Sequence, residues 1–383
     1  MKWHLITGEY PPQPGGVSTY TRQVARALAA ADEDVTVWAP PVSSPDTLDP
    51  GVIVHRLPDM FGRRSLRLID AELERDPSPQ RRLVQYVPHA FGLKGANLRF
   101  CRWVAAPSRH PLWVMFHEVG FPFDVRQSPL RNALALANRV MARLVVRSAS
   151  RVFVSIPGWR AMLEPLAASG TDMTWLPVPS GIGVAGDAAR AAAVRARFAD
   201  GRPLVGHFGT YPSSIRGLLA DAILPLAAAT DCRVLLVGPR GAQLRDEIIA
   251  RDRSLAGRVS ATGPLTDVEA SAHIAACDLM LQPYPDGISS RRTSAMAALA
   301  HGAAVVSTAG WLTEPVWRSS EAVALADVGD SAALAIEAER LLACPDARAR
   351  VAMAGKRLYD ERFDLRHTIA GLRGTAAAMR VCV

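Results

Sequence analysis

The sequence predicts an α/β protein made of two Rossmann-like, doubly wound domains that face a central cleft. Short apolar runs alternate with amphipathic helical patterns along most of the chain, which is typical of parallel sheets covered by helices. The alternation breaks once, in the Pro- and Gly-rich stretch 177–183, and then restarts. The length of 383 residues is comfortable for two domains of ordinary size.

The expected strands follow the apolar runs of both halves. In the first half they lie at 3–7, 35–38, 52–54, 83–87, 112–116 and 151–155, with a helix at about 17–30. In the second half they lie at 204–208, 233–237, 259–261, 279–281 and 304–307, and the chain from about 332 onward is mostly helical. We therefore expect domains at 1–180 and 181–360, and a C-terminal helical segment at 361–383 that packs back toward the first domain.

The composition is that of an ordinary globular protein, with 49% hydrophobic and 21% charged residues. No stretch approaches the roughly 18 apolar residues of a membrane helix, and the first apolar segment is too short for a secretory signal, so we expect a cytoplasmic protein. The five cysteines form no CxxC pair, which argues against a disulfide framework or a zinc site. No metal or other cofactor is expected.

The formal charge of +8 is uneven along the chain. Residues 1–180 hold 21 basic and 15 acidic residues, a net charge of +6, which leaves +2 for the rest. Such a surplus suits anionic ligands or an anionic membrane surface. A nucleic-acid partner is not expected, because no aromatic-interleaved basic motif is present.

Two loops of the first half could carry chemistry, because each follows an expected strand. Gly15 and Gly16 stand at the start of a helix, where backbone amides and the helix dipole favour an anion, although a plain strand-to-helix turn would look the same. His117 ends the strand at 112–116, where it could contact a sugar hydroxyl or act on a proton. A structural hydrogen bond is its alternative role.

The second half repeats this arrangement after its first strand. Gly209 opens the loop there, and Arg216 falls where a helix should begin. A guanidinium at that place could grip a diphosphate with its planar, permanently charged fork. The alternative is one more surface arginine.

The segment 283–302 has the richest pattern, because a strand enters a small polar loop and then an Ala-rich helix. Asp286 could accept hydrogen bonds from sugar hydroxyls, and the backbone amides of Ile288, Ser289 and Ser290 would be free to face a ligand. Ser294 lies on the first turns of the helix. A solvated loop would also explain the polar residues, but it explains the run of small residues on the helix less well.

Together these segments resemble the retaining glycosyltransferases of family 4, which have the GT-B fold. The resemblance covers nearly the whole chain. It rests on these stretches: Glu9-Tyr10-Pro11-Pro12 with Gly15-Gly16-Val17, His117, Pro177-Val178-Pro179-Ser180-Gly181-Ile182, Gly263-Pro264-Leu265 with Asp267, the region 278–306, and Thr313-Glu314-Pro315.

The resemblance implies roles for several of these residues. It places Gly15 and Gly16 near the donor diphosphate, His117 on the donor sugar, and the Gly263-Pro264-Leu265 turn beside the nucleotide base. In the family's Glu-x7-Glu motif the first Glu corresponds to Asp286 and the second, which holds the ribose, to Ser294. The clamping Lys corresponds to Arg216 and the clamping Arg to the Gly209-Thr210 region. The remaining donor-binding expectations, including arginines that could restore the missing charge, are Arg291, Arg292 and Glu314.

The expected function is transfer of a sugar from a UDP- or GDP-sugar to a hydroxyl of a glycan, a lipid-linked acceptor or a small molecule. The resemblance implies that the transfer retains the anomeric configuration and needs no metal. Because two motif positions are replaced, a catalytically weak scaffold that binds a nucleotide sugar or a partner transferase is the main alternative. A sugar-nucleotide epimerase on the same fold is another, and it lacks a specific motif here.

A basic helix in the first half predicts attachment to the inner face of a membrane. Between Arg126 and Arg160 there are seven arginines and no acidic residue, and 129–148 reads as an amphipathic helix. The apolar stripe is expected to contain Leu130, Leu134, Ala137, Met141 and Leu144. Its other side would present Arg131, Arg139, Arg143 and Arg147 to anionic lipid. An ordinary outer helix face is the alternative.

Overall fold

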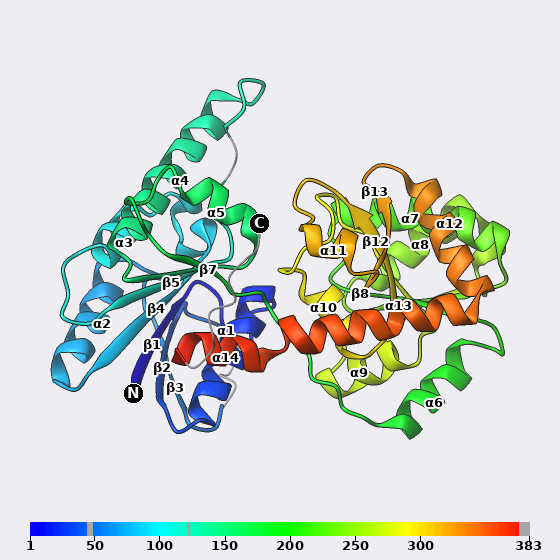
Figure 1. The fold of residues 1–383 in the computed structure, drawn as a ribbon, viewed down its shortest axis with the longest axis horizontal. Helices are drawn as coiled ribbons and strands as arrows, with labels where there is room; N and C mark the ends of the chain where they lie inside the picture. Colours follow the sequence, from blue (N-terminus) through cyan, green and yellow to red (C-terminus); the bar gives the residue numbers. More distant parts are fainter. Residues whose placement is uncertain (44–48, 121–122, 375–383) are drawn as a thin grey trace. The chain divides into compact units, whose positions relative to one another are not determined.

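The computed structural model of the protein describes residues 1–43, 49–120 and 123–374. The chain forms two compact units. The first combines Met1–Val178 with the chain from Leu365 onward, and the second is Pro179–Asp364. Each unit contains one parallel sheet with helices on both of its faces, so the prediction of two Rossmann-like domains is confirmed (Figure 1).

The sheet of the first unit has seven parallel strands in the order β3-β2-β1-β4-β5-β6-β7. Its strands are β1 (Lys2–Thr7), β2 (Asp34–Ala39), β3 (Val52–Arg56), β4 (Gln80–Tyr86), β5 (Leu112–Phe116), β6 (Arg151–Val154) and β7 (Met173–Trp175). The strand order reverses between β1 and β4, whose residues pair in register from Lys2 opposite Gln80 to Thr7 opposite Gln85. The loops after these two strands therefore open at the switch point of the sheet, where ligands of such folds bind.

The helices of the first unit are α1 (Gly16–Ala29), α2 (Arg63–Arg75), α3 (Leu98–Val104), α4 (Pro129–Ser148), α5 (Pro157–Leu163) and α14 (Leu365–Arg373). Helices α1 and α14 pack against each other, and their apolar residues join those of the central strands in one core that contains Trp3, Leu83 and Leu372. Helix α3 packs against α4. The N-terminal end of α4 projects away from the sheet (Figure 1).

The sheet of the second unit has six parallel strands in the order β10-β9-β8-β11-β12-β13. Its strands are β8 (Leu204–Phe208), β9 (Arg233–Val237), β10 (Val259–Ala261), β11 (Leu279–Gln282), β12 (Ala304–Ala309) and β13 (Ala324–Asp327). The strand order reverses between β8 and β11, which pair at Leu279 opposite Val205. The loops after β8 and β11 are therefore neighbours at the carboxyl edge of this sheet.

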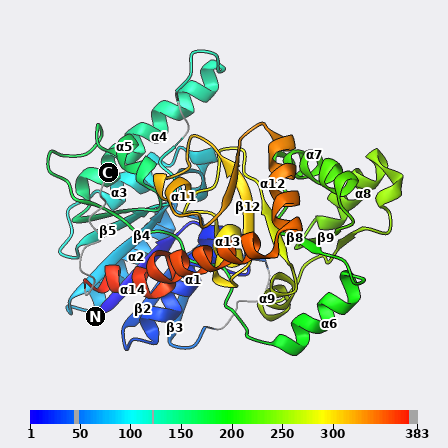
Figure 2. The ribbon, with the colours of Figure 1, turned by 45° about the vertical axis from the view of Figure 1, so that its right-hand side comes forward.

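The helices of the second unit are α6 (Ala188–Phe198), α7 (Ser213–Ala229), α8 (Gly241–Arg251), α9 (Asp267–Ala275), α10 (Thr293–Ala300), α11 (Pro315–Ser319), α12 (Ser331–Ala343) and α13 (Pro345–Leu358). Helix α7 packs against α8 and α12, whereas α10 packs against α13, and α6 against α9. Figure 2 shows α7, α8 and α12 gathered beyond β8 and β12, with α13 crossing in front. None of the helices in the described ranges has the length and apolarity that a bilayer span requires.

The sequence located most of these elements because their signals are local. Helix α4 has the predicted bounds, since Ser128 caps its first turn and Pro129 occupies the first helical position. Strands β5, β8, β9 and β10 also match. The expectations omitted β7 and β13, which are short edge strands with only three and four residues. So short an apolar run carries little period of its own.

Candidate functional site

The loop after β11 brings one carboxylate and two guanidinium groups together. Arg291 Nη2 donates to Asp286 Oδ2 over 2.6 Å, and Arg292 forms an ion pair with the other carboxylate oxygen. The guanidinium of Arg292 also lies 4.6 Å from the centre of the Tyr284 ring. All three charged side chains are less than one quarter exposed. The group has two positive charges against one negative, so it favours a further anion.

A buried carboxylate holds the next part of this loop in place. Glu314, whose exposure is 5%, accepts hydrogen bonds from the backbone N of Ser290 (2.9 Å), from the Ser290 hydroxyl and from Trp317 Nε1 (2.7 Å). Burial raises the pKa of Glu314, while these hydrogen bonds oppose the shift. These contacts give Glu314 a role in positioning the loop. The donor-binding role expected from the sequence stays a prediction.

The expectation that the backbone amides from Ile288 to Ser290 are all free is wrong for two of them. The Ile288 amide donates to the Thr308 carbonyl over 2.7 Å, and the Ser290 amide donates to Glu314. Both bonds arise because the loop folds back onto β12 and its following turn. Ser289 differs, because its hydroxyl is fully buried and has no hydrogen-bond partner among the described residues. A buried polar group of this kind is costly unless a ligand or water satisfies it.

Ser294 is placed on the first turn of α10 and points back at the strand end. Its hydroxyl lies 2.8 Å from the hydroxyl of Tyr284, which is buried and whose hydroxyl lies 3.4 Å from Gln282 Oε1. Burial raises the pKa of Tyr284 to about 12, so the phenol stays protonated. The Ser294 hydroxyl therefore closes a chain of neutral hydrogen bonds beneath the Arg292 guanidinium.

Arg216 stands on the first turn of α7, as expected, at the carboxyl end of β8. Its Nε donates to Glu247 over 3.2 Å, and its Nη1 donates to the Tyr211 carbonyl over 3.3 Å. Glu247 belongs to α8, the next helix. An ion pair to a half-exposed carboxylate is weak enough for an incoming phosphate to compete with it.

The loop that begins at Gly209 is packed tightly against its neighbour. A Cβ on Gly238 would meet the Gly209 carbonyl oxygen at 2.3 Å, and Gly238 has a φ of 120°, which suits only glycine. Gly238 in turn bridges to Gly263, the first residue of the expected base-binding turn Gly263-Pro264-Leu265. The structure thus joins the loops after β8, β9 and β10 along the same carboxyl edge.

His207, which the sequence reasoning did not single out, is the penultimate residue of β8 and lies next to this loop. It is buried, its Nδ1 has no partner among the described residues, and its ring packs 4.8 Å from that of Tyr211. Burial lowers the pKa of His207 to about 3. The imidazole is therefore neutral near neutral pH, and no sequence pattern marks it out.

In the first unit, His117 lies at the carboxyl end of β5. Its Nε2 donates to Gln85 Oε1 over 2.8 Å, because an amide oxygen can only accept. Its ring meets Tyr20 edge to face at 4.8 Å, and burial lowers its pKa to about 3. With Nε2 protonated, Nδ1 is the acceptor atom, and it has no partner among the residues that the structure describes.

Acidic side chains lie close to the Gly15–Gly16 loop of the first unit, and the sequence reasoning missed them. A Cβ on Gly15 would lie 2.3 Å from Oε2 of Glu9, so this carboxylate sits directly against the loop. His89, which follows β4, contacts Glu118, which follows β5, over 3.4 Å. Burial raises the pKa of Glu9, His89 opposes this shift, and Glu118 adds to it. The switch point of this sheet therefore gathers two carboxylates beside the loop, whose Pro11 carbonyl accepts a hydrogen bond from Arg56.

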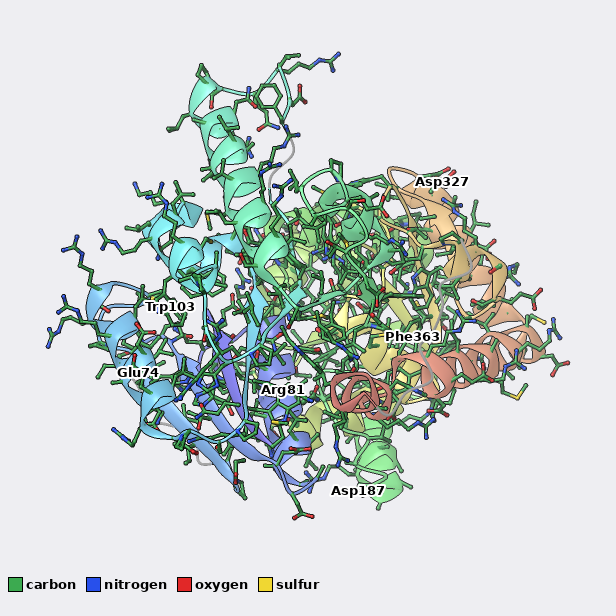
Figure 3. The ribbon with its side chains drawn as sticks, turned by 60° about the vertical axis from the view of Figure 1, so that its left-hand side comes forward. Glu74, Arg81, Trp103, Asp187, Asp327 and Phe363 are labelled. Carbon is green, nitrogen blue, oxygen red and sulfur yellow. The ribbon has the colours of Figure 1, made fainter. Side chains whose placement is uncertain are left out.

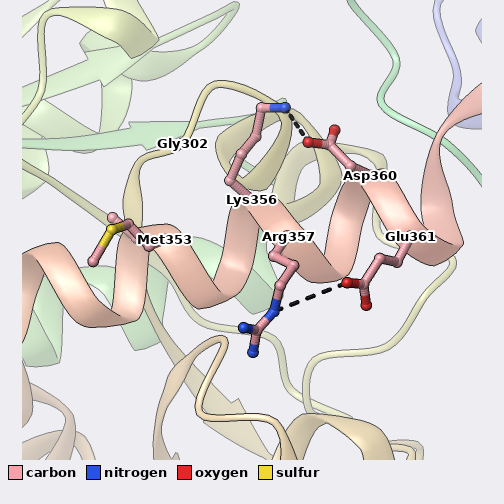
Figure 4. Close-up of a pocket in the computed structure, with 7 residues that line it drawn as sticks. Gly302, Met353, Lys356, Arg357, Asp360 and Glu361 are labelled. Carbon is pink, nitrogen blue, oxygen red and sulfur yellow. Dashed lines mark hydrogen bonds and ion pairs between the residues drawn. The ribbon is translucent and has the colours of Figure 1, made fainter.

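A depression of about 560 Å³ on α13 lies elsewhere in the second unit (Figure 4). Its charges are paired along the helix, Lys356 with Asp360 at 2.5 Å and Arg357 with Glu361 at 4.0 Å. It borders Gly302, which precedes β12 and so belongs to the amino-terminal edge of the sheet. Neither feature suits a donor site. Within the described ranges, no three His, Cys, Asp or Glu side chains are grouped to hold a metal ion.

The apolar stripe of α4 is displaced from the predicted one. The buried positions are Ala135, Asn138, Met141, Ala142, Val145 and Val146, whereas Leu130 of the predicted stripe is 81% exposed. The reason is that α3 and the sheet contact a neighbouring face, which includes the buried amide of Asn138. The four predicted arginines are exposed.

Comparison with known proteins agrees with this architecture. A family model described as a glycosyl transferase 4-like domain matches residues 15–168, and one described as glycosyl transferases group 1 matches residues 202–344. No curated protein sequence matches the chain significantly.

Several solved structures are similar over nearly their whole length. Sucrose-phosphate synthase from Thermosynechococcus elongatus superposes with a TM-score of 0.75 at 18% identity, covering 98% of each chain. HepE from Anabaena, crystallised with UDP and glucose, gives 0.68 at 17% identity, covering 98% of this chain and 99% of its own. An α,α-trehalose-phosphate synthase from Burkholderia vietnamiensis gives 0.63 at 13% identity, covering 98% of each chain.

The two family models follow each other in the order of the two units and together span most of the chain. The structural neighbours share the same two-sheet fold throughout. The chain therefore belongs to the glycosyltransferases of the family 4 type, with the GT-B fold.

Proposed function

We propose that this glycosyltransferase takes its sugar from a nucleotide diphosphate, without a metal ion and with retention of configuration, and transfers it to a hydroxyl acceptor. The observation that carries the proposal is the Asp286–Arg291–Arg292 group at the carboxyl edge of the second sheet. It offers fixed cationic charge where an α/β sheet binds its ligand. The similar structure of HepE was solved with UDP-glucose, which supports the same donor class here.

The leaving group needs charge stabilisation as the bond to the anomeric carbon breaks. Negative charge then grows on the diphosphate, and guanidinium groups held in position lower the barrier because they need no reorganisation. Arg291 and Arg292 are held by Asp286, and Arg216 is held by Glu247. A diphosphate that binds these arginines would compete with the two carboxylates for the same N–H groups.

The sugar itself would be oriented by neutral groups. The Nδ1 acceptor of His117 suits a sugar hydroxyl, because Gln85 fixes the tautomer and burial keeps the ring uncharged. In the second unit, the buried hydroxyl of Ser289 has no partner among the described residues and likewise suits a ligand hydroxyl. Each group would gain a hydrogen bond at little cost in side-chain freedom.

Turnover of UDP- and GDP-sugars, with and without excess EDTA, tests the proposal. Activity should survive EDTA, and Arg216→Ala or Asp286→Ala should each cut turnover by tenfold or more, as expected for a lost charge-assisted contact of roughly 1.5–3 kcal/mol. Arg251→Ala is the matched control, since Arg251 makes an exposed ion pair with Asp221. Complete loss in EDTA that magnesium or manganese restores would contradict the metal-independent reaction.

The same assay separates the alternative functions. A scaffold without catalytic activity would bind the donor, seen as a thermal shift, and release no nucleotide with any acceptor. An epimerase would convert the donor sugar in the absence of acceptor. Release of nucleotide diphosphate that depends on an acceptor would exclude both.

We also propose that α4 attaches the protein to anionic lipid. Its exposed face mixes Arg139, Arg143 and Arg147 with two exposed apolar side chains, Leu136 (60% exposed) and Val140 (41%). Such a face suits the boundary between head groups and acyl chains. Vesicles with anionic lipid should co-sediment the protein at low salt, and Arg139/Arg143/Arg147→Ser should abolish this. Absence of binding to anionic vesicles would remove the idea.

A further inference from the structure

A second hollow lies at the amino-terminal edge of the first sheet. The Gly15–Gly16 loop lies at the opposite, carboxyl edge. It has a volume of about 530 Å³ and is formed by α2, the start of β4, the end of α3 and the turn before β5. The residues that matter are Asp70, Arg82, Trp103, Arg109 and His110. Figure 3 labels Trp103 and, close to it, Glu74, another residue of the lining.

Arg82 is the unusual member of this group. It is 5% exposed, its Nε donates to the His110 carbonyl over 3.3 Å, and neither Nη1 nor Nη2 has a partner among the described residues. Burial is the main cause that lowers its pKa, which reflects the cost of enclosing a charge. A buried guanidinium normally has a carboxylate or several carbonyl groups around it. Here Nη1 and Nη2 can donate hydrogen bonds to a ligand in the hollow.

The acidic residues of the hollow do not satisfy Arg82. Asp70 accepts a hydrogen bond of 2.8 Å from Trp103 Nε1 and acts on Arg82 through its charge alone, without a hydrogen bond or a close ion pair between them. Glu74 belongs to the exposed turn of α2 and is not bonded to Arg82. The charge of Asp70 raises the pKa of Arg82 and so offsets part of the effect of burial. The hydrogen-bonding positions on the two Nη atoms stay open to a ligand.

The other groups of the hollow are already fixed in place. Arg109 donates through Nη2 to the Leu73 carbonyl over 3.2 Å and through Nε to His110 Nε2 over 3.1 Å. Trp103 is anchored by its bond to Asp70, and its half-buried indole lines the hollow. A planar aromatic surface and a planar guanidinium with free N–H groups thus border one cavity.

We propose that this hollow binds an aromatic anion, with a phosphate or carboxylate group on the Nη atoms of Arg82 and the ring against Trp103. A planar guanidinium matches two oxygens of either group, and an indole supplies apolar contact for a ring. The inference goes beyond glycosyl transfer and does not depend on the identity of the donor. It assigns a separate ligand site to the first unit.

Tryptophan fluorescence of the full chain, titrated with phenyl phosphate, benzoate and inorganic phosphate, tests this site. Phenyl phosphate or benzoate should give a saturable change that disappears in Trp103→Phe. Arg82→Gln should weaken that binding by about tenfold or more, as expected for a lost charge-assisted contact. Inorganic phosphate shows how much of the affinity depends on the ring, and the two aromatic probes distinguish phosphate from carboxylate.

Arg81→Gln is the matched control, because Arg81 is adjacent on β4 but packs over Trp3 and Trp113 on the opposite face of the sheet. It should bind the probes as the unchanged chain does. If Arg82→Gln does not fold, Arg82→Lys keeps the charge and loses the fork, and it should still weaken binding. The absence of a saturable change with any probe, or equal affinity in the Arg82 and Arg81 variants, would overturn the proposal.

Discussion

The two sheets have the same parallel construction but differ in the chemistry at their carboxyl edges. In the first unit, the loops at the switch point bring together Glu9, His89 and Glu118, with the neutral His117 nearby. In the second unit, the corresponding loops bring together Arg291 and Arg292 around one carboxylate. The first edge gathers two carboxylates next to the glycine loop, and the second gathers two guanidinium groups around one carboxylate.

Because the two sheets share the same backbone construction, the side chains in their loops decide which ligand groups each edge suits. Both edges offer helix N-termini, which favour anions regardless of sequence. Only the second adds paired guanidinium groups, which is the reason for proposing that it holds the diphosphate. The first is better suited to hydroxyl groups, because Glu9 and Glu118 would repel phosphate when ionised and accept hydrogen bonds from a polyol.

The largest expected effect on stability comes from Glu314, which holds the loop that carries Arg291 and Arg292. Glu314→Ala removes the carboxylate that accepts hydrogen bonds from the Ser290 amide, the Ser290 hydroxyl and Trp317 Nε1. We expect the free energy of unfolding of the second unit to fall by about 3 kcal/mol or more, since each buried donor costs about 1–3 kcal/mol. Urea denaturation measures this directly.

The control for that change is Glu337→Ala. Glu337 accepts from Arg340 on the outside of α12, in an exposed ion pair. Such pairs contribute about 0–1 kcal/mol, so the control should unfold almost as the unchanged chain does. Equal destabilisation by the two variants would mean that the Glu314 contacts do not hold the loop.

How far the sequence predicts this comparison depends on the range of each interaction. The fold and most strands follow from apolar periodicity, which is local, and the helix at 129–148 has the predicted ends. The contact of Glu314 with Ser290 joins residues 24 positions apart, and no local pattern reports it. The roles assigned by resemblance to Asp286, Ser294 and Arg216 stay predictions, although the structure places all three at one sheet edge.

Glycine substitutions sharpen the comparison next, because the same change should cost different amounts in the two loops. In Gly238→Ala the new Cβ would meet a backbone oxygen at 2.3 Å, at a φ of 120°. We expect a loss of about 2–3 kcal/mol in stability from the strained backbone alone. In Gly15→Ala the new Cβ crowds the end of the flexible Glu9 side chain, and it meets Ser18 Cβ at an ordinary contact distance of 3.7 Å. Its cost should stay below about 1 kcal/mol. Thermal unfolding that ranks the two variants in reverse order would contradict this.

A pH titration of stability distinguishes the two units through one buried histidine in each. Burial lowers the pKa of His117 and of His207 to about 3, from 6.5. Both rings are neutral in the folded chain, and the unfolded chain takes up protons as the pH falls below 6.5. Their contribution to stability is therefore complete above pH 6.5 and is lost as the pH falls toward 3, by up to about 1.4 kcal/mol per pH unit for each ring.

Replacement of either ring should flatten this dependence for its own unit. We expect His117→Gln and His207→Gln each to lose less stability than the unchanged chain between pH 6 and pH 5, as measured by urea denaturation with hydrogen exchange to assign the unit. If the free energy of unfolding depends on pH in the same way in the unchanged chain and both variants, neither histidine is held neutral by burial.

The smallest expected effect decides whether the first unit touches the diphosphate at all. Glu9 lies against Gly15, and burial together with Glu118 raises its pKa. If the Gly15 and Gly16 amides bound the diphosphate, an adjacent carboxylate would oppose them, and Glu9→Gln would tighten UDP binding several-fold. If the second unit holds the diphosphate, Glu9→Gln should change the dissociation constant of UDP by less than about twofold.

Arg292→Gln, which removes a charge beside Asp286, should weaken UDP binding by about tenfold. Calorimetric titration of both variants with UDP measures the contrast, and several-fold tightening in Glu9→Gln would return the glycine loop to the donor site.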